Sequence, residues 1–216
     1  MASDRHNIVL TGFMGTGKTV VGRRIAEVSG RTFVDLDLEI VAKHGEIAKI
    51  FERDGEERFR EIERETVARI APNRNLVIAT GGGTMLDPDN VVAFLGADIF
   101  TLSADADKIF ERVQADGIDG RPLLDTDDPK AEVERLLSER AETYEKFTSI
   151  DTTDMSVDEV VSAIGAAGGD VEPPAVQNIA GRVTENNEDP REAILRLLIA
   201  AIAVILIIIV AFVLAF

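Results

Sequence analysis

The 216-residue sequence contains no cysteine, two histidines and few aromatic residues. The absence of cysteine excludes disulfides, thiolate metal sites and cysteine nucleophiles. With His6 and His44 as the only imidazoles, we do not expect a histidine-rich metal site. Basic residues are also scarce, and the formal net charge of −16 argues against a nucleic-acid partner, because nothing would offset phosphate repulsion.

The first residues show no secretory signal. Met1–Asn7 is polar and leads directly into the apolar run Ile8–Leu10, which predicts a short buried strand. We therefore expect the folded domain to stay in the cytoplasm, where ATP is.

A phosphate-loop motif follows this strand. The pattern G-x-x-x-x-G-K-[ST] is satisfied by Gly12, Gly17, Lys18 and Thr19. Glycines let backbone N–H groups surround a phosphate, the lysine supplies positive charge, and the threonine hydroxyl can bind Mg²⁺. A helix expected over Thr19–Ser29 would direct its positive end to the same anion. The alternative, a plain glycine-rich turn, is disfavoured because strand, loop and helix occur in the required order. The motif predicts binding of a nucleoside triphosphate.

Strands and helices alternate along the rest of the domain. Further strands are expected near residues 32–37, 75–80, 98–102 and 150, and helices near 46–71 (broken at Asp54-Gly55), 87–94, 104–113, 129–147 and 157–167. This alternation predicts an α/β fold, a P-loop three-layer sandwich with a mainly parallel central sheet of about five strands flanked by helices.

Four further features of this domain are candidates for a functional site. Asp35 and Asp37, at the end of the second strand, could serve Mg²⁺ and an acceptor hydroxyl, or equally could cap a helix beginning near Leu38. Arg60 and Glu63 share a helix face, and their spacing alone favours a solvated ion pair. Three glycines, 81–83, directly follow a buried strand, which indicates close approach of a ligand to the backbone. The polar, glycine-punctuated stretch 114–126 is typical of a lid.

These motifs together resemble those of the shikimate kinases over about residues 6–165. The resemblance is carried, in order, by Gly12-Phe-Met-Gly-Thr-Gly-Lys-Thr, Asp35-Leu-Asp37, Gly55-Glu-Glu-Arg-Phe-Arg-Glu-Ile-Glu63, Gly81-Gly-Gly83, Arg121-Pro-Leu-Leu and Arg140-x-x-x-Tyr144. It implies ATP-dependent phosphorylation of the 3-hydroxyl of shikimate.

The resemblance also implies roles for individual residues. The nucleotide would be held by Gly15, Thr16, Gly17, Lys18, Thr19, Val20, Arg112 (against adenine) and Arg121. Thr19 would bind Mg²⁺ with Asp35 helping through water. Shikimate would be held by Asp37, Arg60, Glu63, Gly81, Gly82, Gly83 and Arg140. The catalytic residues would be Lys18, Asp37, which orients or deprotonates the acceptor hydroxyl, and the lid residue Arg121.

The chain departs from this pattern in two places. The lid between Arg112 and Arg121 is slightly longer than in compact members of the family. Beyond residues 1–165, a breaker-rich stretch at 166–190 predicts a flexible linker, and 191–216 predicts a transmembrane anchor. Residues 197–216 are all apolar, enough for a helix of about 30 Å, the thickness of a bilayer core.

The tail suggests a single-pass anchor with the domain on the cytoplasmic face. Arg182, Arg191 and Arg196 precede the apolar span and no cation follows it. A buried core helix is the alternative, but such helices usually have a polar face. The span contains no G-x-x-x-G pattern, and we expect a monomer.

Two other functions stay open at this stage. One is a related small-molecule kinase acting on gluconate or a nucleoside monophosphate. The other is a non-catalytic, nucleotide-binding membrane adaptor, although an idle site would not need Lys18, Asp37 and Arg121 together.

Overall fold

The computed structural model describes residues 5–117, 122–124 and 126–172. These form a five-stranded sheet in the order β2-β3-β1-β4-β5, with every neighbouring pair parallel. The strands are β1 (Ile8–Thr11), β2 (Thr32–Asp35), β3 (Leu76–Ala79), β4 (Asp98–Ser103) and β5 (Thr148–Asp151). The five-stranded parallel sheet predicted from the sequence is confirmed.

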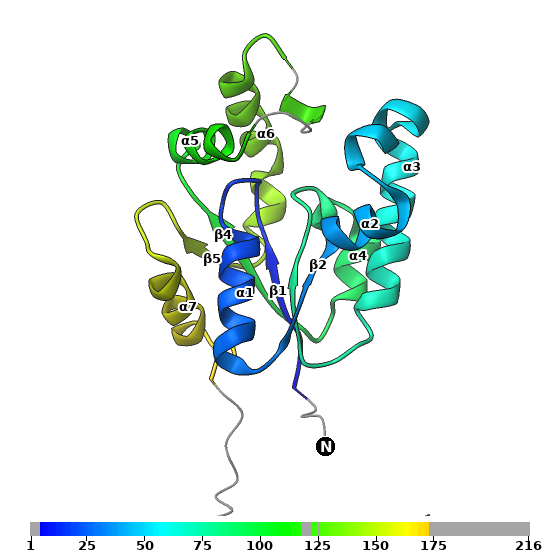
Figure 1. Ribbon diagram of the computed structural model, residues 1–216. Helices are drawn as coiled ribbons and strands as arrows, with labels where there is room; N and C mark the ends of the chain where they lie inside the picture. Colours follow the sequence, from blue (N-terminus) through cyan, green and yellow to red (C-terminus); the bar gives the residue numbers. More distant parts are fainter. Residues whose placement is uncertain (1–4, 118–121, 125, 173–216) are drawn as a thin grey trace, which may run out of the picture. The chain divides into compact units, whose positions relative to one another are not determined.

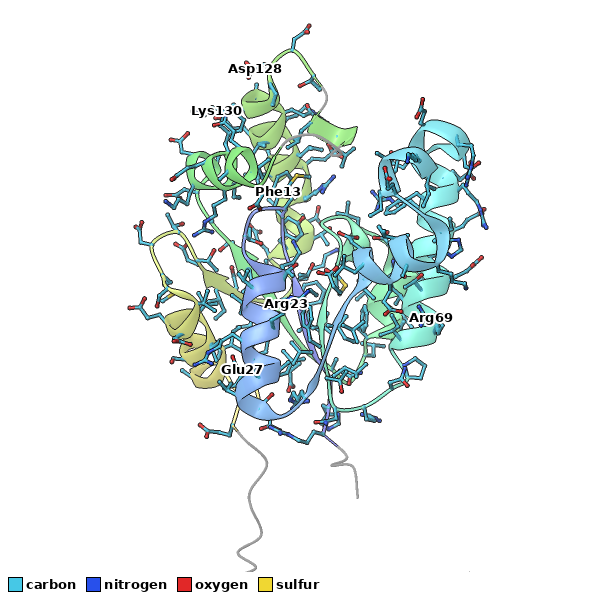
Figure 2. All side chains as sticks on the ribbon, viewed as in Figure 1. Phe13, Arg23, Glu27, Arg69, Asp128 and Lys130 are labelled. Carbon is cyan, nitrogen blue, oxygen red and sulfur yellow. The ribbon has the colours of Figure 1, made fainter. Side chains whose placement is uncertain are left out.

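Helices cover both faces of this sheet (Figure 1). They are α1 (Lys18–Ser29), α2 (Leu36–His44), α3 (Ile47–Ile70), α4 (Pro88–Ala93), α5 (Ala106–Asp116), α6 (Pro129–Tyr144) and α7 (Val157–Ala166), with short 3-10 turns η1 (Thr84–Leu86) and η2 (Pro122–Leu124). Figure 2 shows Phe13 in the loop between β1 and α1, and Glu27 near the opposite end of α1.

The two faces are built by alternating side chains of the strands. On β1, Ile8 and Leu10 pack with α1 and α7, whereas Val9 packs with residues of α3 and the α4 region. All three side chains are fully buried. A strand buried on both faces reads as a continuous apolar run, as a parallel sheet covered by helices requires.

The order of strands places the phosphate loop at a crevice. β1 lies between β3 and β4, so the chain leaves β1 where connections diverge to opposite sides of the sheet. Gly12, the first residue after β1, has φ 127°, and a Cβ there would collide with the carbonyl oxygen of Leu102. Glycine is therefore required for β1 to continue into the loop beside β4.

The second strand is shorter than the sequence suggested. β2 ends at Asp35 and α2 begins at Leu36, so Asp37 lies in the first turn of a helix and not on the strand. The Asp35 carboxylate caps that helix, accepting from the N–H groups of Asp37 (3.1 Å) and Leu38 (3.3 Å). The break predicted at Asp54-Gly55 is confirmed as a non-helical Gly55 within α3, at φ 81°.

The predicted linker and anchor lie outside the described residues, apart from residues 166–172. Among residues 5–117, 122–124 and 126–172, no helix is long and apolar enough to cross a membrane. The span at 197–216 therefore stays a prediction.

Candidate active site

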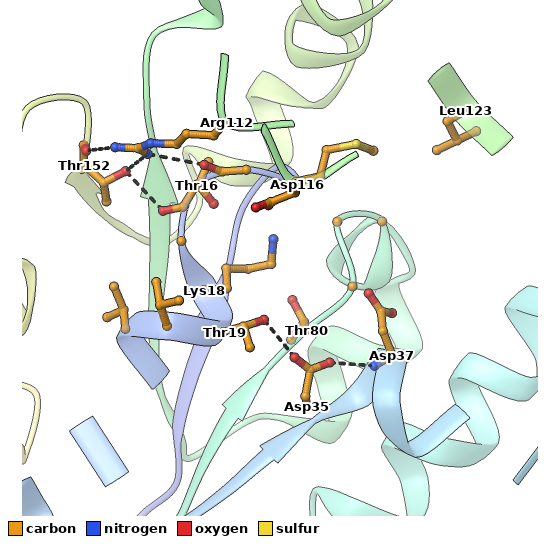
Figure 3. A pocket seen from close by; sticks show the side chains of 18 of the residues that line it. Thr16, Lys18, Thr19, Asp35, Asp37, Thr80, Arg112, Asp116, Leu123 and Thr152 are labelled. Carbon is orange, nitrogen blue, oxygen red and sulfur yellow. Dashed lines mark hydrogen bonds between the residues drawn. The ribbon is translucent and has the colours of Figure 1, made fainter. Parts of the chain in front are cut away.

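A pocket of about 660 Å³ opens at the carboxyl ends of the strands. One part is lined by the loop between β1 and α1 together with Arg112 and Thr152, and the other by Asp37, Arg60 and Arg140. Figure 3 shows Lys18 between the Arg112–Thr152 side and Asp37. Residues that the sequence assigned to a nucleotide and to an acceptor thus line one continuous cavity.

The phosphate loop is held open by left-handed glycines. Gly15 has φ 76° and Gly17, the N-cap of α1, has φ 93°. Thr16 is buried and its hydroxyl donates to the Phe13 carbonyl at 2.7 Å. The Lys18 ammonium donates to the carbonyls of Gly12 (2.9 Å) and Phe13 (2.8 Å). The loop and the first turn of α1 therefore form an anion cradle with a cation at its mouth.

Oxygen ligands suited to a hard cation meet beside this loop. The Thr19 hydroxyl donates to Oδ2 of Asp35 at 2.8 Å, and the other Asp35 oxygen caps α2 (Figure 3). A hydroxyl and a carboxylate next to a phosphate cradle fit Mg²⁺, which prefers oxygen ligands and phosphate oxygens. Within the described ranges, no group of three or more His, Asp or Glu side chains could hold a metal by itself. One oxygen of Asp35 caps α2 and the other contacts Thr19. The helix-cap role therefore does not exclude a role beside Mg²⁺.

The surroundings of Asp37 raise its pKa and so favour proton acceptance by its carboxylate. Burial, reinforced by the negative charges of Asp35 and Glu63, raises the pKa of Asp37 to about 6, while Lys18 and Arg60 oppose the shift. A carboxylate with a pKa closer to neutrality is a better general base than an ordinary aspartate. Asp37 lies on α2, across the pocket from Arg112 (Figure 3).

Arg60 and Glu63 form a partly buried ion pair. The distance from Nη1 of Arg60 to Oε2 of Glu63 is 2.8 Å, and the Glu63 side chain is 2 % exposed. A second carboxylate, Glu56, holds Arg60 from the solvent side at 3.0 Å. The spacing alone favoured an ion pair exposed to solvent, and this prediction is wrong for Glu63. Its side chain is buried because this face of α3 packs against η1 and the glycine segment.

The glycine segment 81–83 has different steric demands at each position. A Cβ at Gly81 would lie 2.8 Å from Oδ1 of Asp37, and a Cβ at Gly83 would lie 2.8 Å from both terminal nitrogens of Arg60. A Cβ at Gly82 would approach no heavy atom closer than 3.6 Å. Gly81 and Gly83 therefore let charged side chains pack directly on the backbone.

Arg140 reaches the same segment from α6. Its Nη1 donates to the Gly82 carbonyl at 3.2 Å, and its Cζ lies 5.5 Å from the centre of the Phe13 ring. The residue is 4 % exposed, and its buried Nε has no hydrogen-bond partner within the described part of the chain. Arg140 also lines the cavity, so its guanidinium can offer a charged donor to an anionic ligand group.

Arg112 links the phosphate loop to the segment after β5. Its guanidinium donates to the carbonyls of Gly15 (3.3 Å), Thr152 (2.7 Å) and Thr153 (3.2 Å) and contacts the Thr152 hydroxyl at 3.2 Å. Val20, at the start of α1, lines this part of the pocket and is 54 % exposed. Arg121 lies outside the described residues.

Three hydroxyl groups support this region, and none of them was assigned a role from the sequence. The Tyr144 hydroxyl donates to the Gly82 carbonyl at 2.6 Å, the Thr84 hydroxyl donates to Glu63 at 2.6 Å, and the Thr152 hydroxyl donates to the Thr16 carbonyl at 3.1 Å. Tyr144 closes the Arg140-x-x-x-Tyr144 motif, and this spacing places it on the same helix face as Arg140. Thr84 and Thr152 are single hydroxyls in turns, and no sequence pattern marks them.

The parallel sheet, the phosphate loop and the charged cavity beside it are typical of a P-loop kinase. A family model described as "Shikimate kinase" matches residues 14–167. The chain belongs to the shikimate kinase family and is an ATP-dependent kinase.

Curated relatives and solved structures agree with this assignment. The chain is 44 % identical over 162 residues to the shikimate kinase of Thermodesulfovibrio yellowstonii, covering 73 % of this chain and 92 % of the relative. It is 44 % identical over 161 residues to that of Pelotomaculum thermopropionicum, with the same coverage of 73 % and 92 %. The structure of shikimate kinase from Acinetobacter baumannii in complex with shikimate matches with a TM-score of 0.71 and 33 % identity, over 76 % of this chain and 93 % of that one.

Proposed function

We propose that this chain transfers the γ-phosphoryl group of ATP to the 3-hydroxyl of shikimate. The observation that carries the proposal is the pairing of Arg60 and Arg140, from two different helices, around a cavity that also contains Asp37. Shikimate presents a carboxylate and ring hydroxyls, which are the groups that guanidinium donors and an aspartate can bind. The substrate named for the solved relative with bound shikimate supports the same acceptor.

On the acceptor side, Arg60 and Arg140 bind the carboxylate. Glu63 holds Arg60 in place, and the Gly81–Gly83 backbone gives the ring close access. Asp37 contacts the 3-hydroxyl and accepts its proton as the oxygen attacks.

On the nucleotide side, the loop N–H groups from Gly15 to Thr19 and the first turn of α1, which includes Val20, surround the phosphates. Lys18 neutralises phosphate charge, and Arg112 lies against the adenine. Thr19, helped by Asp35, would hold Mg²⁺, and the metal would supply positive charge that neutralises the phosphate oxygens. By resemblance to the family, Arg121 stabilises the transferring phosphoryl group.

The transfer itself exchanges one P–O bond for another. The 3-hydroxyl oxygen bonds to the γ-phosphorus while the bond to the β–γ bridging oxygen breaks. The hydroxyl proton passes to the Asp37 carboxylate, and the products are shikimate 3-phosphate and ADP. Positioning and charge neutralisation supply most of the catalysis in such reactions.

ADP release by the purified full-length protein tests the proposal. Shikimate, gluconate and a set of nucleoside monophosphates are each supplied with Mg-ATP, and the panel is repeated with Asp37→Asn. Turnover with shikimate alone, largely lost in the variant, is expected. Turnover only with another acceptor would overturn the assignment of the arginine pair, and ATP binding without any turnover would favour a nucleotide-binding adaptor.

We further propose that residues 191–216 anchor the enzyme, as a monomer, to the cytoplasmic face of a membrane. Fractionation of cells followed by carbonate extraction tests this. The wild-type chain should stay in the pellet, whereas Ile207→Lys at the middle of the span should move to the supernatant, because a central lysine costs about 2.5–3.5 kcal/mol of insertion energy. Ile207→Leu is the control, and a wild-type chain that extracts completely would contradict the anchor.

A further inference from the structure

The acceptor-binding pair Arg60–Glu63 is supported by a third side chain. Oε2 of Glu63 receives a hydrogen bond from Arg60 Nη1 at 2.8 Å, and Oε1 receives one from the Thr84 hydroxyl at 2.6 Å. The two oxygens of one carboxylate are thus bound from opposite directions. Fixing Oε1 to Thr84 sets the rotation of the carboxylate and so the direction in which Oε2 faces.

Burial makes this contact important. The Glu63 side chain is 2 % exposed and Thr84 is fully buried, so water cannot replace a lost hydrogen bond without rearrangement. A buried carboxylate is tolerated only when its oxygens are hydrogen-bonded or paired. The other carboxylate on Arg60, Glu56, is 56 % exposed and is screened by solvent. Glu63 is therefore the partner that fixes the orientation of Arg60.

Thr84 is itself held rigidly. Its N–H donates to the Gly81 carbonyl at 3.3 Å, and its carbonyl accepts from Nδ2 of Asn90 at 2.9 Å. Asn90 lies in α4 and is 2 % exposed. These two hydrogen bonds hold the backbone of Thr84 on both sides. The direction of its hydroxyl is therefore set by the turn that follows the glycine segment.

The three residues form a chain of contacts that ends at the cavity. Thr84 does not line the pocket, whereas Glu63 and Arg60 do. On the far side, Arg60 is packed against the backbone of Gly83. The guanidinium therefore sits between a glycine that limits its approach and a glutamate whose rotation is set by Thr84.

We propose that Thr84 is a positioning residue for acceptor binding, acting through Glu63 on the orientation of Arg60. The inference rests on the proposed function, because it names a residue that tunes shikimate binding. Thr84 is not among the residues that line the pocket, so it would act without contacting a substrate. Its loss should weaken binding of the acceptor carboxylate and leave the nucleotide side unchanged.

The experiment compares Thr84→Val, which keeps the shape and removes the hydroxyl, with Thr84→Ser, which keeps the hydroxyl. Ser29→Ala is the matched control, because it removes a buried hydroxyl hydrogen bond of 2.6 Å to the Ile25 carbonyl at the far end of α1. KM values for shikimate and ATP, kcat and the thermal midpoint are measured on full-length protein. We expect Thr84→Val to raise the shikimate KM about tenfold, with the ATP KM within about twofold and Thr84→Ser close to wild type.

A double-mutant cycle shows whether Thr84 acts through Glu63. Calorimetric binding of shikimate is measured for the wild type, Thr84→Val, Glu63→Ala and the double variant. In the absence of Glu63, the second substitution should weaken binding by less than about twofold, because neighbouring sites that act together are non-additive.

Each result decides a different point. An unchanged shikimate KM in Thr84→Val, an equal rise in Ser29→Ala, or an undiminished effect in the Glu63→Ala background would overturn the positioning role. A wild-type enzyme without turnover on shikimate would instead refute the proposed function, whatever the variants do.

Discussion

The guanidinium of Arg60 lies where a side chain at Gly83 would have to be. A Cβ at Gly83 would be 2.8 Å from Nη1 and from Nη2 of Arg60, closer than real Cβ contacts allow. Arg60 can therefore occupy this position only because residue 83 has no side chain, although the two residues are more than twenty positions apart in the chain.

Replacing this glycine should displace the arginine. We expect Gly83→Ala to raise the KM for shikimate by about tenfold or more, as for loss of a charged hydrogen bond, without a comparable change in the ATP KM. Gly82→Ala is the comparison, because its Cβ would keep 3.6 Å from Nη1 of Arg140. Steady-state kinetics show which of the two substitutions raises the shikimate KM more. A larger rise in Gly82→Ala would contradict the steric argument.

The raised pKa of Asp37 predicts the pH dependence of the reaction. With a pKa of about 6, the carboxylate is charged above this pH and becomes protonated below it, so kcat/KM should fall as the pH drops through about 6. Asp37→Asn should lower kcat by about 10²–10⁴-fold and remove this limb. A profile flat from pH 5 to 8 in the wild-type enzyme would argue against Asp37 as the base.

The same shift predicts an effect of Asp37 on stability. A carboxyl whose pKa is higher in the folded than in the unfolded chain binds protons more readily when folded. The contribution of Asp37 to the free energy of unfolding is therefore fully present below the pKa of the unfolded chain. It is lost as the pH rises through about 6. We expect Asp37→Asn to raise the thermal midpoint of the ligand-free protein at pH 8 but not at pH 4, which calorimetry can measure.

Tyr144 should contribute to the acceptor site through the glycine segment. Its hydroxyl donates to the Gly82 carbonyl at 2.6 Å, beside the bond from Arg140 at 3.2 Å. Tyr144→Phe removes one hydrogen bond of about 0.5–1.5 kcal/mol, so a rise of about threefold to tenfold in the shikimate KM is expected. The KM for ATP serves as the internal control, and a change confined to ATP would contradict this assignment.

Arg112 should affect the nucleotide alone. Its guanidinium joins the phosphate loop at Gly15 to the segment after β5 at Thr152 and Thr153. Arg112→Ala should raise the ATP KM about tenfold, and Arg112→Lys should not restore it, because an ammonium cannot reproduce the planar set of donors. Arg135→Ala, which removes an exposed arginine paired with Glu132 and Glu139, is the control.

Thr19 should determine the requirement for the metal. Thr19→Val removes the hydroxyl that contacts Asp35 at 2.8 Å, whereas Thr19→Ser keeps it. We expect the Mg²⁺ concentration for half-maximal activity to rise in Thr19→Val and to stay near the wild-type value in Thr19→Ser. A chelator should abolish turnover in all three proteins, and turnover that survives it would contradict the metal assignment.

Local sequence patterns were sufficient for the phosphate loop and the class of fold. The loop depends on residues that are adjacent in the chain, Gly12 to Thr19, and the parallel sheet follows from the alternation of strands and helices. The end of the second strand was predicted two residues too late, because the Asp35 carboxylate caps a helix that already begins at Leu36. The lid residue Arg121 and the span 197–216 lie outside the described residues, and their roles remain predictions.

The sequence by itself determined which residues carry charge near a phosphate cradle and, through ordered motifs, the family to which the chain belongs. Only the tertiary structure decided that Glu63 is buried, that Asp37 belongs to a helix, and that Thr84, Tyr144 and Thr152 support the site. The reason is physical. Burial and hydrogen-bond partners depend on segments far apart in the chain, and a lone hydroxyl gains its importance only from what the fold places opposite it.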